Sequence, residues 1–264
     1  MSSSTPLVSD MVQTPTLASL LQAGVHFGHI KSKWHPKMEK YIYTTRGGVH
    51  IINLEQTVKM LAKALEYMEN LGKQGSLVVF VGTKKQAVVA VAEAAKKTSM
   101  PVVTTRWLGG TLTNFTIIRN LIQNFLTIKS TLESTQRDRY TKKEQLILQR
   151  KMEKLNTTVG GLVPLTRKPD AMVIVDLKRE RTAVAEARKT NTPIIALVDT
   201  NVNPEKVQYP IPANDDAVRS IEIILGLLAD AYLEGKSQAA AQNLSTQPIP
   251  AENLAAQSKE AATV

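Results

Sequence analysis

The sequence contains no cysteine, so disulfide bonds, thiolate metal sites and cysteine nucleophiles are excluded. It also lacks long hydrophobic runs, because stretches such as Ser76–Val81 are far shorter than the roughly 20 residues that a membrane span needs. The Ser/Thr-rich first residues carry no basic stretch followed by an apolar run, so a secretory signal is not expected. These absences predict a soluble cytoplasmic protein without a membrane partner.

Sequence motifs of catalysis are also missing. The chain has no HExxH, no GxGxxG, no GxxxxGKS/T, no Ser/His/Asp ordering and no paired acids in a glycosidase-like context. The turn 81–86 follows a buried strand and opens a helix, a geometry that offers free N–H groups to an anion. Without the nucleotide-binding spacing, it favours a phosphate of bound RNA, or a plain strand–helix turn, over a nucleotide pocket.

What the sequence has in excess is positive charge. Lys and Arg outnumber Asp and Glu by 33 to 23, which gives a net charge of +10 and a pI near 9.7. Such a balance suits a polyanion, either nucleic acid or an anionic membrane surface. Hydrophobic residues make up 43% of the chain, so there is ample material for a buried core.

Short β-branched runs alternate with amphipathic helical patterns, which predicts an α/β fold with a parallel sheet and helices on both faces. Strands are expected at 77–81, 101–105, 171–176 and 193–198, with a short edge strand at 207–211. Helices are expected at 56–71, 84–97, 180–189 and 215–233. Residues 1–15 are interpreted as a flexible N-terminal arm, 16–235 as the α/β domain and 236–264 as a disordered C-terminal tail.

Residues 116–159 interrupt the alternation and predict an inserted α-helical coiled-coil hairpin. Apolar residues recur at spacings of three and four, namely Ile118, Leu121, Phe125, Ile128 and Leu132 in one helix and Leu148, Met152, Leu155 and Val159 in the other. A capping box, Thr141 to Glu144, would begin the second helix, and Gly160-Gly161 would end it. From Arg119 to Lys168, eleven cations face four anions, so the hairpin is suited to lie along phosphates, although a solvated helix face is an equal alternative.

Two other segments are candidates for contact with RNA. Basic and aromatic residues interleave over 31–46, as on an RNA-facing surface. The loop 106–115 combines Arg106, Trp107, two glycines and Asn114, which would allow close approach and stacking; the alternative is a Trp buried at the sheet edge.

Histidine and aspartate residues suggest a cation site. In a parallel sheet, loops at the carboxyl ends of strands gather on one edge, so Asp199 and one of Asp215 or Asp216 would meet there and, with His26, hold a cation. The alternatives are helix capping for the aspartates and packing or RNA contact for the pair His26 and His29.

Over roughly 16–235 the chain resembles the S-two family of small-subunit ribosomal proteins, in its bacterial or organellar form. The resemblance is carried by ordered blocks: LLQAGVHFGHIKSKWHPKMEKYIYTTRGGVHIINLEQT, VGTKKQA, TTRWLGGTLTNF, KPDAMVIVDLKRERTAVAEARK, IIALVDTNVNP and IPANDDAVRSIEIILGLL. It implies a flavodoxin- or Rossmann-like sheet, a non-catalytic place on the small subunit in contact with ribosomal RNA and neighbouring ribosomal proteins, and a part in docking the large RNA-binding protein S-one. It also implies a metal at a site like His26, Asp199 and Asp216.

We therefore expect a structural constituent of the small ribosomal subunit in the cytoplasm, with no small-molecule substrate and no required cofactor; a structural divalent cation, zinc or magnesium, is the optional addition. The alternatives are a nucleotide- or flavin-dependent enzyme on the same fold and a free RNA-binding module acting in trans. The residues expected to bind RNA are Lys31, Lys33, Trp34, Lys37, Arg46, Lys84, Lys85, Arg106, Trp107, Asn114, Arg137, Arg139, Lys142, Lys143, Arg150, Lys151 and Lys154.

Overall fold

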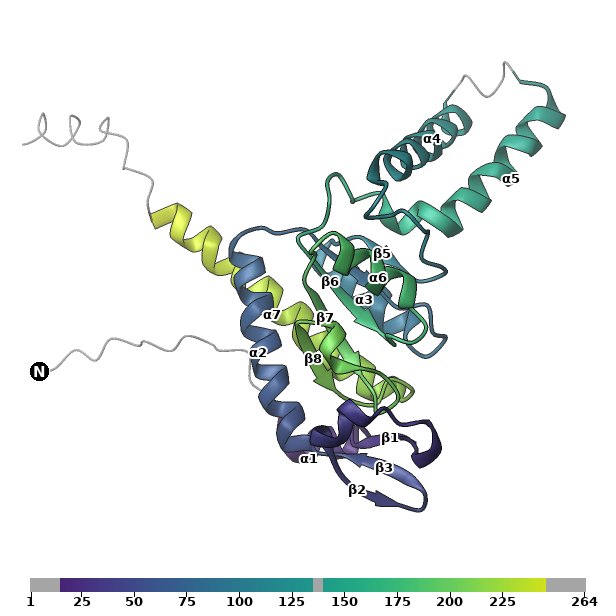
Figure 1. Ribbon diagram of the computed structural model, residues 1–264. Helices are drawn as coiled ribbons and strands as arrows, with labels where there is room; N and C mark the ends of the chain where they lie inside the picture. Colours follow the sequence, from purple (N-terminus) through teal and green to yellow (C-terminus); the bar gives the residue numbers. More distant parts are fainter. Residues whose placement is uncertain (1–14, 135–139, 246–264) are drawn as a thin grey trace, which may run out of the picture.

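A computed structural model describes residues 15–134 and 140–245 (Figure 1). Its centre is a five-stranded, all-parallel sheet in the order β5-β4-β6-β7-β8. These strands are β4 (Val78–Val81), β5 (Val102–Val103), β6 (Ala171–Val175), β7 (Ile194–Val198) and β8 (Tyr209–Pro212). The order is the 2-1-3-4-5 arrangement of flavodoxin-like folds, so the predicted α/β class is confirmed.

Strand alternation divides the interior into two cores. Val78 and Phe80 of β4 point toward one face, whereas Val79 and Val81 point toward the other. The first face is covered by α1 (Leu17–Gln22), α2 (Leu54–Lys73), α3 (Val88–Thr98) and α7 (Val218–Ser245). The second face is covered by α6 (Arg181–Lys189), the 3-10 helices η2 (Pro36–Tyr41) and η4 (Gly160–Leu162), and the root of the hairpin.

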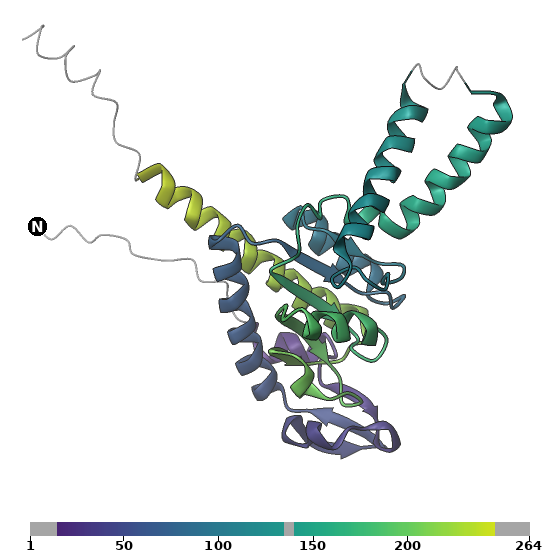
Figure 2. The ribbon, with the colours of Figure 1, turned by 45° about the horizontal axis from the view of Figure 1, so that its top comes forward.

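Helices α2 and α7 lie side by side along the body (Figures 1 and 2). Their backbones approach so closely that a Cβ on Gly72 would overlap the carbonyl oxygen of Tyr232, and one on Gly235 would overlap that of Glu69. Glycine is therefore required at both positions. Helix α7 continues to Ser245, so the prediction of disorder from residue 236 is wrong for residues 236–245.

The N-terminal part forms an antiparallel sheet that the sequence did not predict. Its strands are β1 (Phe27–Ile30), β2 (Ile42–Arg46) and β3 (Val49–Ile52), in the order β1-β3-β2, with irregular register in both pairings. Short 3-10 helices, η1 (Lys31–Lys33) and η2, separate β1 from β2, whereas η5 (Pro204–Lys206) follows β7. This sheet lies at the end of the body opposite the hairpin (Figure 1).

The predicted hairpin is present as α4 (Phe115–Glu133) and α5 (Lys142–Val159), which project from the body as an arm. The capping box of Thr141 and Glu144 is formed, and α5 ends at Val159 with Gly160 as its C-cap, as expected. Of the predicted seam of α4, Ile118, Phe125 and Ile128 are buried, whereas Leu121 and Leu132 are half-buried; Ile122, outside that seam, is also buried. The helices are closest at the root and diverge toward the tip (Figure 2), so the arm is a splayed hairpin rather than a regular coiled coil.

Candidate functional site

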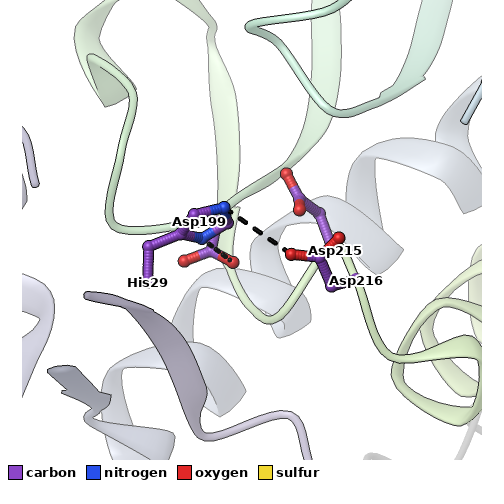
Figure 3. Close-up of side chains that lie close together, drawn as sticks. All are labelled: His29, Asp199, Asp215 and Asp216. Atoms are coloured by element: carbon purple, nitrogen blue, oxygen red, sulfur yellow. Dashed lines mark ion pairs between the residues drawn. The ribbon is translucent and has the colours of Figure 1, made fainter. Parts of the chain in front are cut away.

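One His and three Asp side chains converge at the carboxyl edge of the sheet (Figure 3). His29 comes from β1, Asp199 follows β7, and Asp215 and Asp216 precede α7. One ligand atom of each lies within 4.8 Å of the others, close enough to surround a single cation. His29 Nδ1 is 2.9 Å from Asp199 Oδ2, and its Nε2 is 3.6 Å from Asp216 Oδ2. We refer to these four residues as the His–Asp cluster.

The backbone of β1 is fixed against the end of β7 by Thr200. Its Oγ1 accepts a hydrogen bond from the N–H of His29 at 2.9 Å and lies 3.1 Å from Asp199 Oδ1. Gly28 permits this approach, because a Cβ there would collide with the Thr200 side chain. The side chain of Asn214 accepts from the N–H groups of Asp216 and the next residue, which caps the turn before α7.

Lys84 supplies positive charge to the same cluster. Its Nζ lies 2.6 Å from Asp215 Oδ1, 2.6 Å from Asp216 Oδ1 and 3.7 Å from Asp176 Oδ2. Burial acts to lower the pKa of Lys84, but hydrogen bonds to the two aspartates outweigh it and raise that pKa. Since only 12% of the side chain is exposed, the prediction that Lys84 binds RNA is wrong: the ammonium group is occupied inside the protein.

The cluster nevertheless remains short of positive charge. Burial, followed by repulsion from Asp199 and Asp176, raises the pKa of Asp215 to about 7, although Lys84 opposes the shift. The hydrogen bond to Asp199 raises the pKa of His29, which indicates the same excess of negative charge. A site with this deficit accepts either a proton or a metal cation.

His26 does not belong to the cluster, so its predicted place among the ligands is wrong, whereas Asp199 and Asp216 do converge. The His26 ring packs at 4.0 Å from Phe27, and the residue lines an apolar pocket that also contains Leu17 and Tyr43. Burial lowers the pKa of His26, as expected for a neutral ring. In the sequence, His29 stands out only as the partner of His26, because the sequence does not show which histidine faces the sheet edge.

Most residues expected to bind RNA are exposed. They are Lys31, Lys33, Lys37, Arg46, Lys85, Arg106, Asn114, Lys142, Lys143, Arg150, Lys151 and Lys154. Lys37 forms an ion pair with Glu205, and Trp34 is half-buried with its ring 5.4 Å from that of His50. Arg137 and Arg139 lie outside the described residues.

Trp107 is 6% exposed, so the prediction that it stacks on RNA is wrong and the alternative of a buried Trp is correct. Its Nε1 donates to Glu186 Oε1 at 3.2 Å, and the same oxygen accepts from the N–H of Gly110 at 2.7 Å. The other oxygen accepts from the N–H groups of Leu112 and Thr113 at 3.0 and 3.3 Å. Burial raises the pKa of Glu186, but these hydrogen bonds prevail and lower it. The loop before α4 is thus folded around one carboxylate that the sequence analysis missed.

None of the helices in the described residues has the length and apolar character needed to cross a membrane.

Comparison with known proteins places these features in one family. The family model described as Ribosomal protein S2 matches residues 20–235. The small ribosomal subunit protein uS2c of Cyanophora paradoxa is 48% identical over 83% of this chain and 94% of its own length. The small ribosomal subunit protein uS2 of Acidothermus cellulolyticus is 43% identical over 91% of this chain and 90% of its own. That of Gloeobacter violaceus is 44% identical over 89% and 86%.

Proposed function

Because the chain belongs to the ribosomal protein S2 family, a structural component of the small ribosomal subunit, we propose that it binds small-subunit ribosomal RNA through exposed cations. The relatives are named as ribosomal proteins and not as enzymes, so a structural role in translation replaces the enzyme alternative. The protein associates with the ribosome. We propose the cytoplasm as its compartment, and since the relatives are of bacterial and chloroplast type, cell fractionation decides between the cytoplasm and an organelle.

The observation that supports RNA binding most directly is the arrangement of charge on the arm. All five cations of α5 are exposed, namely Lys142, Lys143, Arg150, Lys151 and Lys154. Within the described part of the chain, none of them forms an ion pair with a carboxylate. The nearby Glu144 is engaged in the capping box, and Glu153 accepts from Gln149. Free cations on a projecting helix suit the phosphates of RNA.

Charge reversal tests this function. Replacing Arg150, Lys151 and Lys154 with Glu should weaken incorporation into small subunits, measured by co-sedimentation through a gradient, without changing the melting temperature. The matched control reverses Lys59, Lys63 and Lys96, three exposed lysines of α2 and α3. Normal incorporation of the arm variant would show that the arm does not face RNA. Wild-type protein found outside ribosomal fractions would favour a free RNA-binding module.

We also propose that the His–Asp cluster binds one divalent cation, zinc or magnesium. The donor set fits: an imidazole and carboxylates converge within 4.8 Å, and the cluster lacks positive charge. The imidazole favours zinc, since magnesium prefers oxygen ligands. Bound there, the cation would supply the missing charge and tie β1 to the edge of the sheet.

Calorimetric titration of two variants with zinc or magnesium tests which of the two histidines, His29 or His26, binds the cation. We expect His29→Ala to abolish binding and His26→Ala, the matched control, to retain it. Binding that survives His29→Ala, or wild-type protein that binds neither ion, would refute the site.

Family resemblance supports the remaining proposal, that the protein helps to dock protein S-one and contacts other small-subunit proteins. Small subunits assembled without this chain should then recover less S-one than complete subunits, as measured by quantitative mass spectrometry. Equal recovery would refute this part of the function.

A further inference from the structure

The turn after β6 exposes cations that the sequence analysis did not select. Asp176 has a left-handed φ of 64°, and its Oδ1 accepts from the N–H groups of Lys178 and Arg179 at 3.0 Å each. The turn buries Leu177 and Glu180, which are 5% and 3% exposed. Lys178, Arg179 and the following Arg181 consequently lie at the surface.

The acidic groups of the neighbouring loops are engaged mainly by other residues, although the charge of Glu180 also acts on Arg179. Asp176 faces Lys84, and Asp199 faces His29. Glu180 accepts from the N–H and Oγ1 of Thr83. The remaining carboxylate, Glu205, pairs with Lys37. In the part of the chain that the structure describes, no ion pair involves Lys178, Arg179, Arg181, Arg106 or Lys206. We call these five residues the carboxyl-edge surface.

Two hollows lie on either side of the turn. The first, of about 450 Å³, is lined by two arginines, Arg106 and Arg179, by the threonines Thr83, Thr105 and Thr182, and by Glu180, among others. The Nε of Arg179 donates to Thr83 Oγ1 at 2.8 Å, which holds the guanidinium in place. The hydroxyls of Thr83 and Thr105 donate to Glu180 and to the carbonyl of Thr157, so the donors that a phosphate would accept here are those of the two arginines.

The second hollow, of about 290 Å³, is lined by Lys178, Arg181, Lys206, His35 and Asn201, among others. Asn201 Oδ1 is buried and accepts no hydrogen bond within the described ranges. Because that oxygen is shielded from solvent, the affinity of this hollow for phosphate comes from its three cations, Lys178, Arg181 and Lys206.

The surface connects the two segments that the sequence linked to RNA. Arg106 lies in the loop that leads into the arm, whereas His35 lies in the N-terminal segment, where its N–H donates to the carbonyl of Thr200 at 2.8 Å. The turn after β6 lies between them on the sheet edge, because the carboxyl ends of parallel strands share one edge.

We infer that the carboxyl-edge surface binds consecutive phosphates of ribosomal RNA, and this inference rests on the proposed function. RNA backbone fits better than a free nucleotide, because the cations are divided between two separate hollows. The first hollow also provides no base-stacking platform, since its Trp107 ring is buried and bonded to Glu186. Contacts of this kind position RNA without reading its sequence.

The test compares two full-length variants of equal charge. The edge variant carries Ala at Arg106, Arg179 and Arg181; the control carries Ala at Lys59, Lys63 and Lys96. Binding to protein-free small-subunit RNA is measured by filter retention over a range of salt. For the edge variant we expect affinity to fall about tenfold or more, and the slope of log affinity against log salt to become shallower by about three. The control should match the wild type.

A third variant with Lys at the three edge positions should keep the wild-type slope, since lysine also neutralises phosphate. All variants should melt within about 2 °C of the wild type, because the replaced side chains are exposed. If the wild type binds RNA and the edge variant binds it as tightly as the control does, the inference is refuted while the proposed function stands. Wild-type protein that binds no RNA would overturn the proposed function itself.

Discussion

Replacement of Glu186, the acidic residue of α6, should destabilise the protein strongly. Its two oxygens accept four N–H groups, from Trp107, Gly110, Leu112 and Thr113. Hydrogen bonds to a charged group contribute about 1.5–3 kcal/mol each, and buried donors left without an acceptor cost about 1–3 kcal/mol. Because such contributions overlap, we expect Glu186→Ala to cost roughly 3–5 kcal/mol.

That loss can be measured by thermal unfolding. At about 2–4 °C per kcal/mol for a chain of this size, the melting temperature should fall by roughly 6–20 °C. Arg188→Ala, an exposed change on the same helix, is the control and should change it by about 1 °C or less. In a Trp34→Phe background, Trp107 fluorescence should also shift to the red as its ring gains solvent. Unchanged melting and emission in Glu186→Ala would refute the idea that the carboxylate organises this loop.

Three further predictions follow from the described contacts. Since folding lowers the pKa of Glu186, its ionised form stabilises the protein above its unfolded pKa of about 4.3, and this contribution is lost as pH falls through the folded pKa. The difference in unfolding free energy between the wild type and Glu186→Gln, measured by urea titration, should therefore shrink below about pH 4. A difference that does not change with pH would contradict this prediction. Gly235→Ala should destabilise the protein by about 1–3 kcal/mol because its Cβ meets the carbonyl of Glu69. Gly226→Ala, with open space around it, should stabilise the protein by about 0.5–1 kcal/mol. Equal melting temperatures of the two variants would count against the close contact between α2 and α7. Thr141→Ala should speed hydrogen exchange in the first turn of α5 by the loss of about 0.5–2 kcal/mol of capping, and unchanged exchange would show that the cap is dispensable.

The sequence predicted the central sheet because its strands are buried on both faces and therefore read as continuous apolar runs. It did not predict the N-terminal sheet, since strands such as Ile42–Arg46 carry exposed polar residues and show no alternation. The helical residues 236–245 were taken for disorder because they lack an apolar face, although Ala and Gln are good helix formers.

Errors at the sites arose from contacts between residues far apart in the chain. Lys84 has the local features of an anion-binding lysine, but Asp215 comes from a loop that no local pattern connects to it. Trp107 was assigned to the surface because its hydrogen-bond partner, Glu186, lies 79 residues away. The choice between His26 and His29 depended on the course of β1, which the sequence did not reveal.

The length of the arm has a consequence for assembly. Helix α5 has 18 residues and therefore extends about 27 Å, several times the screening length of roughly 8 Å at physiological salt. Charges at its tip neither repel nor reinforce those on the body, so RNA bound as proposed would be held at two electrostatically independent sites. Binding at one of these sites would raise the effective concentration of RNA at the other. Either site could then bind first, and the overall affinity would exceed that of each site alone.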